Sequence, residues 1–563
     1  MFYQLSIYVK ILSIVSNKLS CLRNSKELFE IEPIFENCDR IMGVSHFSLK
    51  RGALILLTAL TFLCGPAVRA QVGNPTNDQR LTLAIDVTES LHITSPSYLS
   101  ITISGGQLRR GLIGYDFSSQ KLKNLAAALS PADVRIGGTY SDFLNFDLTS
   151  DNANCVEVTA PGKSSMEALD FTLSGQRWDN ITRFCDQVGW DILWDFNLLD
   201  RHNGSWDPTL ATEFLDYSSS RGMKIPMFEL GNEPNLYERK FDVDIKADQL
   251  VKDYSTLKDL LSQMPQYAAS GLYAPGVNNL DTFSSSRKYL AQFLQNDGCE
   301  ITTEVALHHY YFKAEEAHTQ DFMDVDVMDT LRTQLEFAYN ISWSSCRLRK
   351  PIRFTETSTA SGGGVPDVSN AFIAGFLWLD KLGLSATFGI TRVLRQTFLK
   401  SSYALVTKNL KPNPDYYLSV LFKRLVEGPV FSVSKEGLKP EVRIYAQCVG
   451  KSYYNYPDGA IVVYYLNVGS ESSVLSLGQF QGTDVHLFIL SPGDENGMLS
   501  RKVKLNDELL EMNASDLPSL EPKPHSGDVP LAPKSFGFIV IPEADVQLCK
   551  QYHRHDDGKI VSC

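Results

Sequence analysis

Two glutamates at the ends of apolar runs are the residues of this sequence best suited to chemistry. Glu233 follows the run Met227–Leu230 and is followed at once by a proline, and Glu356 ends the run Ile352–Thr355. Because a proline stops a strand, we expect Asn232 and Glu233 to project from a strand end. Two carboxylates that face one another across a cleft can divide the roles of proton donor and nucleophile.

This pair predicts a retaining glycoside hydrolase. In such enzymes the two carboxyl groups lie about 5–5.5 Å apart across one sugar. We expect Glu356 to be the ionised nucleophile, and its negative charge to raise the pKa of Glu233 so that Glu233 arrives protonated. Asn232 is expected to hydrogen-bond the 2-hydroxyl of the sugar. A single glutamate at a strand end usually forms a surface salt bridge, and Glu229 is interpreted as structural.

The sequence Leu-His-His-Tyr-Tyr at 307–311 supplies further candidates. Neighbouring residues on a strand point to opposite faces, so His308 and His309 are poorly placed to share a metal ion, and no metal or cofactor is expected. We predict that Tyr310 hydrogen-bonds Glu356 and that the histidines are core or supporting groups. The glycines at 362–364 leave backbone N–H groups unobstructed, which suits a sugar carboxylate, although a flexible turn is the alternative.

Short apolar runs alternate along the chain with longer amphipathic stretches, which indicates βα units and a parallel sheet. Eight such units favour a closed (β/α)8 barrel, in which functional groups lie at the C-terminal ends of the strands. Glu233 and Glu356 then end strands four and seven, across the barrel mouth from each other. The predicted strands are Tyr98–Ile103, Asp133–Gly137, Asp191–Phe196, Pro226–Leu230, Gly271–Ala274, Glu304–His308, Ile352–Thr355 and Arg392–Arg395, with helices that include Ala247–Met264 and Asn370–Leu382.

From about Asp415 onward, strand-like runs follow one another with only turns between them, which predicts an appended antiparallel β-sandwich. Cys448 and Cys549 would tie its middle to its last strand. The expected organisation is an upstream segment at 1–41, a signal peptide at 42–70, N-terminal strands at 71–97 that join the sandwich, the barrel at 98–414, the sandwich at 415–549 and a tail at 550–563. The predicted sandwich strands are Val430–Val433, Val442–Gln447, Ala460–Leu466, Val485–Leu490, Val503–Leu505 and Phe536–Ile541.

The formal net charge is -12, so the average surface repels phosphate and sulfate. Nucleic acid is therefore not an expected partner, and a polyanion would need a local basic patch. From Met42, a basic start, the apolar run Ala53–Cys64 and a small-residue exit at Ala70 are typical of a secretory signal. Four sequons fit this route, at Asn180, Asn203, Asn340 and Asn513.

The motifs at 229–235 and 308–311, with Glu-Thr-Ser at 356–358 and the glycines at 362–364, resemble the heparanase family. The resemblance implies an endo-β-glucuronidase of the extracellular matrix and lysosome that acts on heparan sulfate, with possible matrix or peripheral membrane association through proteoglycans. It implies Glu233 as proton donor and Glu356 as nucleophile. It further implies that Gly362, Gly363 and Tyr403 hold the uronic carboxylate, that Thr139 and Gln396 line the sugar site, that Cys155–Cys185 and Cys448–Cys549 are disulfides, and that 145–175 is a linker-like segment.

Two departures from that family bear on function. Ser104 stands where the family has an aspartate that contacts the glucuronic acid. The basic clusters are thin, and the candidates near the cleft are Arg239, Lys240, Arg287, Lys288 and Lys313. Two alternatives therefore stay open: a non-catalytic homologue that binds heparan sulfate, and an exo-acting β-glucuronidase.

Overall fold

The computed structural model describes residues 79–148, 170–434, 437 and 439–555. The chain divides into the units Met1–Asn77 and Asp78–Cys563, and all described residues belong to the second. The predicted upstream segment, the signal peptide at 42–70 and Cys155 lie outside the described residues, as does most of the linker-like segment.

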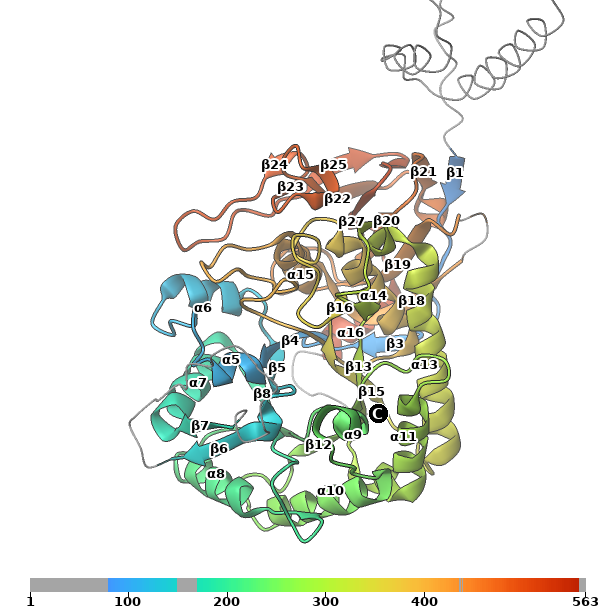
Figure 1. Cartoon of the computed structure of the whole chain (residues 1–563). Helices are drawn as coiled ribbons and strands as arrows, with labels where there is room; N and C mark the ends of the chain where they lie inside the picture. Colours follow the sequence, from blue (N-terminus) through green and yellow to red (C-terminus); the bar gives the residue numbers. More distant parts are fainter. Residues whose placement is uncertain (1–78, 149–169, 435–436, 438, 556–563) are drawn as a thin grey trace, which may run out of the picture. The chain divides into compact units, whose positions relative to one another are not determined.

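Eight parallel strands close into a barrel in which β17 pairs back onto β4, as predicted (Figure 1). Every predicted barrel strand is confirmed, with bounds that shift by a few residues at most. Parallel strands are buried on both faces, which explains why they are near-continuous apolar runs in the sequence. The strands are β4 (Leu99–Ser104), β5 (Ala132–Gly137), β8 (Trp190–Phe196), β11 (Met227–Leu230), β12 (Gly271–Val277), β13 (Glu304–His309), β15 (Ile352–Thr357) and β17 (Val393–Arg395).

Helices connect the barrel strands, and their apolar faces pack toward the barrel. The α10 face illustrates the pattern, because Leu250, Tyr254, Leu257 and Leu261 are buried at helical spacing. The helices are α5 (Gly105–Arg109), α6 (Gln120–Ala127), α7 (Gly175–Val188), α8 (Thr209–Ser220), α9 (Tyr237–Phe241), α10 (Ala247–Ser262), α11 (Ser285–Phe293), α12 (Cys299–Ile301), α13 (Val325–Ser345), α14 (Ala374–Phe388) and α15 (Pro414–Leu425).

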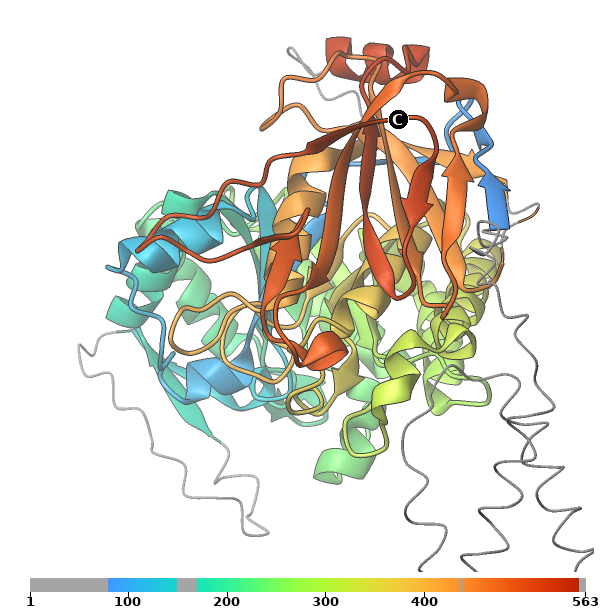
Figure 2. The same ribbon diagram turned by 90° about the horizontal axis from the view of Figure 1, so that it is seen from above.

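The chain from Val426 onward forms most of the predicted antiparallel layer, a ten-stranded sheet that packs beside the barrel (Figure 2). In β20 (Ile461–Asn467), Val462 and Tyr464 belong to the core shared with the barrel, whereas Val463 and Tyr465 belong to a second core. This alternation buries both faces of the strand. The other strands include β18 (Val426–Val433), β19 (Val442–Val449), β22 (Asp484–Pro492), β23 (Val503–Leu505) and β27 (Ser535–Ile541).

The start of the chain and α15 both join this layer. Strands β2 (Ile85–Asp86) and β3 (His92–Thr94) pair with β18, and β1 (Gln79–Thr82) pairs with β21 (Ser473–Ser476) of a second, three-stranded sheet. Helix α15 occupies the first part of the range 415–549, which the sequence assigned to the sandwich with its first strand at Val430–Val433. The sheet strands therefore begin at Val426.

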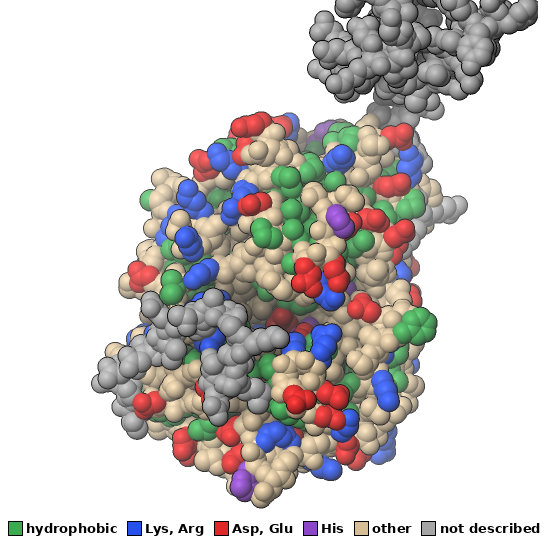
Figure 3. Space-filling model, viewed as in Figure 1, with side chains coloured by type: hydrophobic (Ala, Val, Ile, Leu, Met, Phe, Trp, Pro, Cys, Tyr) green, Lys and Arg blue, Asp and Glu red, His purple; other side chains and the backbone are tan. Residues whose placement is uncertain are grey.

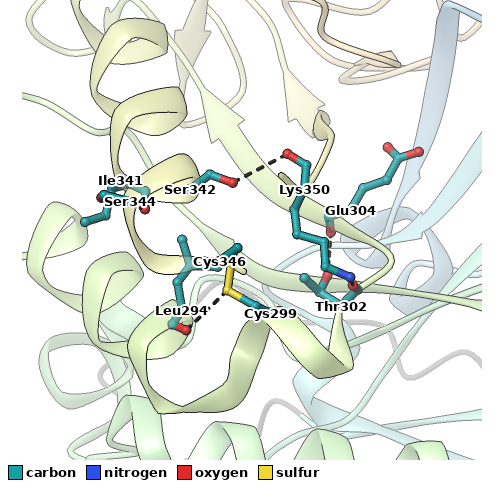
Figure 4. Close-up of a disulfide and its surroundings, with 9 residues drawn as sticks. All are labelled: Leu294, Cys299, Thr302, Glu304, Ile341, Ser342, Ser344, Cys346 and Lys350. Carbon is teal, nitrogen blue, oxygen red and sulfur yellow. Dashed lines mark hydrogen bonds between the residues drawn. A yellow bond between two sulfur atoms is a disulfide. The ribbon is translucent and has the colours of Figure 1, made fainter. Parts of the chain in front are cut away.

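Two disulfides are present among the described cysteines. Cys448–Cys549 is confirmed, and Cys299–Cys346 joins α12 to the end of α13 (Figure 4). Cys185 is a buried free thiol on α7, and its predicted pairing with Cys155 stays a prediction. Among the sequon asparagines, Asn203, Asn340 and Asn513 are exposed and Asn180 is half-buried.

In the part of the chain that the structure describes, every helix is too short or too polar to cross a membrane.

Candidate active site

The end of β11 presents Glu233 in an uncommon backbone conformation. Glu233 has φ 55°, in the left-handed region, and precedes the short helix η3 (Pro234–Leu236). Gly231 has φ 80°, and a Cβ there would lie 2.6 Å from the Leu198 side chain. Few non-glycine residues adopt a positive φ, and such positions concentrate at functional sites. The turn after β11 therefore aims the Glu233 side chain out of the strand end.

A buried arginine that the sequence did not predict as a site residue holds the carboxylate of Glu356 in position. Arg135, on β5, donates from Nη1 to Glu356 Oε2 at 2.9 Å and from Nη2 to Asn232 Oδ1 at 3.1 Å. The same guanidinium forms ion pairs with Glu229 and, at 3.2 Å, with Asp195. Glu229 is thus structural, as predicted, since it helps to position Arg135.

The Arg135 cluster holds more negative than positive charge. Three buried or nearly buried carboxylates, Asp195, Glu229 and Glu356, contact the one guanidinium. Burial raises the pKa of Asp195, Arg135 lowers it and Glu229 raises it, with a net rise to about 6. Burial also raises the pKa of Asp142, which accepts a hydrogen bond from the Asn232 N–H at 3.2 Å.

Tyr310 contacts Glu356 from the other side. Its hydroxyl donates to Glu356 Oε1 at 2.6 Å, which confirms the predicted hydrogen bond. Asn279 fixes the Tyr310 backbone, because its Oδ1 accepts from the Tyr310 N–H and its Nδ2 donates to the Tyr310 carbonyl. The Tyr310 ring stacks on Tyr403 with 6.3 Å between centroids. Each oxygen of Glu356 therefore accepts one hydrogen bond, which fixes the carboxylate.

Glu233 has different partners, and the expected rise of its pKa is wrong. Lys240 Nζ donates to Glu233 Oε2 at 2.9 Å, and His308 Nδ1 lies 3.2 Å from Oε1. Burial raises the pKa of Glu233, but the Lys240 ammonium and His308 outweigh burial and lower that pKa to about 2. The Glu356 charge is paired with Arg135, whereas the Lys240 ammonium contacts Glu233 directly.

Both glutamates line one open cleft of about 900 Å³ at the C-terminal end of the barrel strands. Figure 3 shows this hollow, with acidic side chains inside it and basic side chains near its edge. Gly362 and Gly363 have φ 82° and 103°, and Ser401 Oγ donates to the Gly363 carbonyl at 2.7 Å. The predicted substrate-binding residues that line the cleft are Thr139, Asn232, Tyr310, Gly362, Gly363, Gln396 and Tyr403, and Ser104, the departure from the family, lines it as well.

The basic residues of the cleft match the prediction only in part. Arg239, Lys240 and Lys313 line it, as do Arg110 and Lys400, which the sequence reading missed. Arg287 and Lys288 are not among the lining residues. Arg287 donates to the Leu280 carbonyl at 2.9 Å and lies over the Phe337 ring, and Lys288 is exposed on α11. Arg110 and Lys400 lie in loops after β4 and β17, so their position in a loop at the barrel mouth was the available signal.

The two histidines lie on different sides of β13. His308 faces Glu233, whereas His309 is buried in an edge-to-face contact with Tyr311. Burial and the nearby Lys381 ammonium lower the pKa of His309 well below its usual value. Among the described residues, no group of three or more His, Cys, Asp or Glu could hold a metal ion.

Comparison with known proteins agrees with this geometry. Residues 107–383 match the family described as glycosyl hydrolase family 79, N-terminal domain. The chain is 33% identical to heparanase from Bos taurus over 84% of its own length and 93% of the bovine protein. It is 28% identical to a hyaluronoglucuronidase from Hirudo nipponia, covering 84% of this chain and all of the leech protein. It is also 29% identical to inactive heparanase-2 from Mus musculus, covering 88% of this chain and 95% of the mouse protein.

Solved structures share the fold at low identity. A 4-O-alpha-L-rhamnosyl-beta-D-glucuronidase from Fusarium oxysporum aligns with a TM-score of 0.60 and 14% identity, over 82% of this chain and 100% of that chain. A GH51 arabinofuranosidase from Xanthomonas axonopodis aligns with a TM-score of 0.58 and 11% identity, over 82% and 99%. This chain has a closed eight-stranded barrel, an appended antiparallel sheet and 33% sequence identity to bovine heparanase over 93% of that protein. It therefore belongs to the heparanase family of glycoside hydrolases.

Proposed function

We propose that this protein is a retaining endo-β-glucuronidase that cleaves internal β-glucuronide linkages of heparan sulfate or a related glucuronic-acid-containing polysaccharide. The observation that supports this most is that Glu233 and Glu356 line one cleft from opposite strands, with Glu356 held between Tyr310 and Arg135. A fixed carboxylate inside an open cleft is suited to attack the anomeric carbon of a bound sugar.

The proposed reaction has two steps. Glu356 attacks the anomeric carbon of the glucuronic acid while Glu233 gives its proton to the departing glycosidic oxygen, so that a covalent glycosyl-enzyme forms. Glu233, now ionised, then takes a proton from a water molecule that attacks the same carbon and releases Glu356. Asn232, whose Oδ1 is held by Arg135, is placed to hydrogen-bond the 2-hydroxyl.

Recognition of the sugar carboxylate is assigned to the loops after β15 and β17. The left-handed backbone of Gly362 and Gly363 carries no Cβ, so an anionic group can approach the main chain closely. The Tyr403 carbonyl is fixed by Arg395 Nη2 at 3.0 Å, and this contact anchors the loop beside the glycines. Thr139 and Gln396 complete the wall around the same sugar.

An extended polyanion fits the cleft better than a single sugar. Its volume of about 900 Å³ lies near the upper end of the range of small-ligand sites, about 300–1,000 Å³. The basic side chains that line the cleft are Arg110, Arg239, Lys240, Lys313 and Lys400, and the carboxylates there outside the proposed catalytic pair are Asp281 and Glu316. This balance favours a polysaccharide of moderate negative charge.

We further propose that the protein is secreted and acts in the extracellular matrix, the lysosome or both. The signal-like sequence at 42–70 and the four sequons support this route. Association with matrix or membrane surfaces would then arise through proteoglycans that carry the substrate.

The test compares wild type with Glu233→Ala and Glu356→Ala on heparan sulfate fragments and on an aryl glucuronide, with and without azide. The Glu356 variant should lose turnover, and azide should rescue the Glu233 variant and yield a β-glucuronyl azide, because azide needs no general base. Chain cleavage supports the proposal. Release of the aryl group alone indicates an exo-acting enzyme, and binding without turnover by the wild type indicates a non-catalytic homologue.

A further inference from the structure

Lys240 forms an ion pair with the residue proposed as proton donor. The chain turns back after Glu233 through η3 into α9, and this brings the Lys240 Nζ to 2.9 Å from Glu233 Oε2. The Lys240 side chain is 27% exposed, whereas that of Glu233 is only 13% exposed. A long side chain with this exposure can leave its partner and reach a ligand in the cleft, because its ammonium is a point charge on a flexible stem.

Groups from every neighbouring element act on Glu233. His308 on β13 contacts Oε1 at 3.2 Å, and its Nε2 is buried without a hydrogen-bond partner among the described residues. Tyr310 follows on the same strand end, and Glu356 lies across the cleft with its charge paired to Arg135. The remaining charged groups that line the cleft are Arg110, Asp281, Arg239, Lys313, Glu316 and Lys400.

This arrangement conflicts with the first step of the reaction. A proton donor must carry its proton when the substrate binds, yet the Lys240 ammonium stabilises the ionised form of Glu233. We propose that Lys240 is a substrate-sensing positioning residue, which holds Glu233 as a carboxylate in the free enzyme until an anionic group of the bound polysaccharide draws the ammonium away and Glu233 takes up a proton from solvent. The inference rests on the proposed function of this site.

Because Glu233 is buried, its pKa responds strongly both to contact with Lys240 and to the loss of that contact. With Lys240 in contact, the pKa of Glu233 lies at about 2, so little of the proton donor is loaded at mildly acidic pH. Once the ammonium pairs with a sulfate or carboxylate of the substrate, desolvation of Glu233 acts with less opposition and raises its pKa. The enzyme would therefore favour chains that place an anion next to the scissile bond. It would discriminate against chains that bear none there.

The experiment compares wild type, Lys240→Met and Lys313→Met on two polymers, heparan sulfate fragments and the same fragments after complete desulfation and N-acetylation. Values of kcat/KM are measured from about pH 4 to 7, since their pH dependence reports the ionisations of the free enzyme. Lys313 is the matched control, because it lines the same cleft but pairs with Glu316 instead of Glu233.

We expect Lys240→Met to raise kcat/KM on the desulfated polymer by about tenfold or more near pH 5, which corresponds to at least one unit in the pKa of the donor. The falling limb of its profile should move to higher pH, and its preference for sulfated chains should shrink. Lys313→Met should weaken binding of the sulfated chain without moving that limb. An equal loss on both polymers with an unchanged pH profile would reduce Lys240 to a simple binding residue and overturn the inference. A wild type inactive on both polymers at every pH would instead remove the proposed function.

Discussion

Arg135 Nη1 donates to Glu356 Oε2 at 2.9 Å, and the arginine side chain is only 1% exposed. The same guanidinium reaches Asn232, so one buried cation sets the position of the proposed nucleophile and of the amide that would contact the 2-hydroxyl. Glu229 and Asp195 in turn fix Arg135 from the barrel interior. The position of the Glu356 carboxylate therefore depends on a buried guanidinium that Glu229 and Asp195 hold in place.

Replacement of Arg135 by lysine should impair catalysis more than binding. Lysine keeps the charge but has no planar fork, so it cannot hold Glu356, Asn232 and the two buried carboxylates together. We expect kcat to fall by about 100-fold, the cost typical of a displaced catalytic group, with a smaller change in KM. Steady-state kinetics on the polymer and the melting temperature of the variant provide the check. A folded Arg135→Lys protein with wild-type kcat would show that this network does not position Glu356.

Tyr310→Phe should remove one charge-assisted hydrogen bond while keeping the ring in place. Such a bond contributes about 1.5–3 kcal/mol, so we expect kcat to fall by about 10- to 100-fold if the bond orients Glu356. The stack on Tyr403 does not involve the hydroxyl, and the melting temperature should change little. Tyr311→Phe is the comparison, because its hydroxyl donates to the Leu377 carbonyl instead of a carboxylate. Equal losses in both variants would contradict the role assigned to Tyr310.

The barrel and the sheet could be predicted from the sequence because their signals are local. Buried parallel strands give short apolar runs between amphipathic helices. Strand β20 is also a continuous apolar run, because each of its two faces packs against a different hydrophobic core. Helix α15 was missed because its aromatic residues resemble a strand. Its proline at the first helical position was the signal that could have indicated a helix start.

Without the resemblance, which supplied Gly362, Gly363, Gln396 and Tyr403, the site could be predicted only where a residue lies at the end of a strand. Glu233, Glu356 and Tyr310 do so, whereas Arg135 lies inside β5 between Val134 and Ile136, whose side chains join the core on the other face. Only closure of the barrel turns Arg135 toward three carboxylates from other strands. The pairing of Lys240 with Glu233 likewise depends on the path of α9, and the spacing of residues in the sequence does not determine that path.

The charge of the Arg135 cluster predicts how stability depends on pH. The pKa of Asp195 is raised to about 6 in the folded protein from a usual value near 3.8. The folded state thus binds this proton more tightly than the unfolded state, and its stabilising effect is complete below about pH 4 and is lost as the pH rises through about 6. The slope from this one group is at most about 1.4 kcal/mol per pH unit.

Asp195→Asn should remove that contribution, because asparagine does not titrate but still offers an oxygen to Arg135 and Ser141. Urea unfolding at pH 4, 5, 6 and 7 gives the free energy of unfolding for both proteins. Carboxylates remote from this cluster titrate alike in both proteins, so the difference reports Asp195 together with Asp142, whose pKa the Asp195 charge raises. We expect the variant to gain stability relative to wild type as the pH rises from about 4 to 6. A difference that is constant with pH would contradict the raised pKa.

The Cys299–Cys346 disulfide should stabilise the packing of α12 against the end of α13. It spans a sequence separation of 47 residues, and constraint of the unfolded chain over such a loop is worth about 4 kcal/mol in the chain-entropy estimate. We therefore expect the double variant Cys299→Ser/Cys346→Ser to lose up to this amount in the free energy of unfolding. Peptide mapping without reduction verifies the bond in the wild type.

Because both cysteines lie away from the residues that line the cleft, the variant should keep its kcat at temperatures where it stays folded. A variant as stable as the wild type would show that the crosslink adds nothing to this part of the barrel.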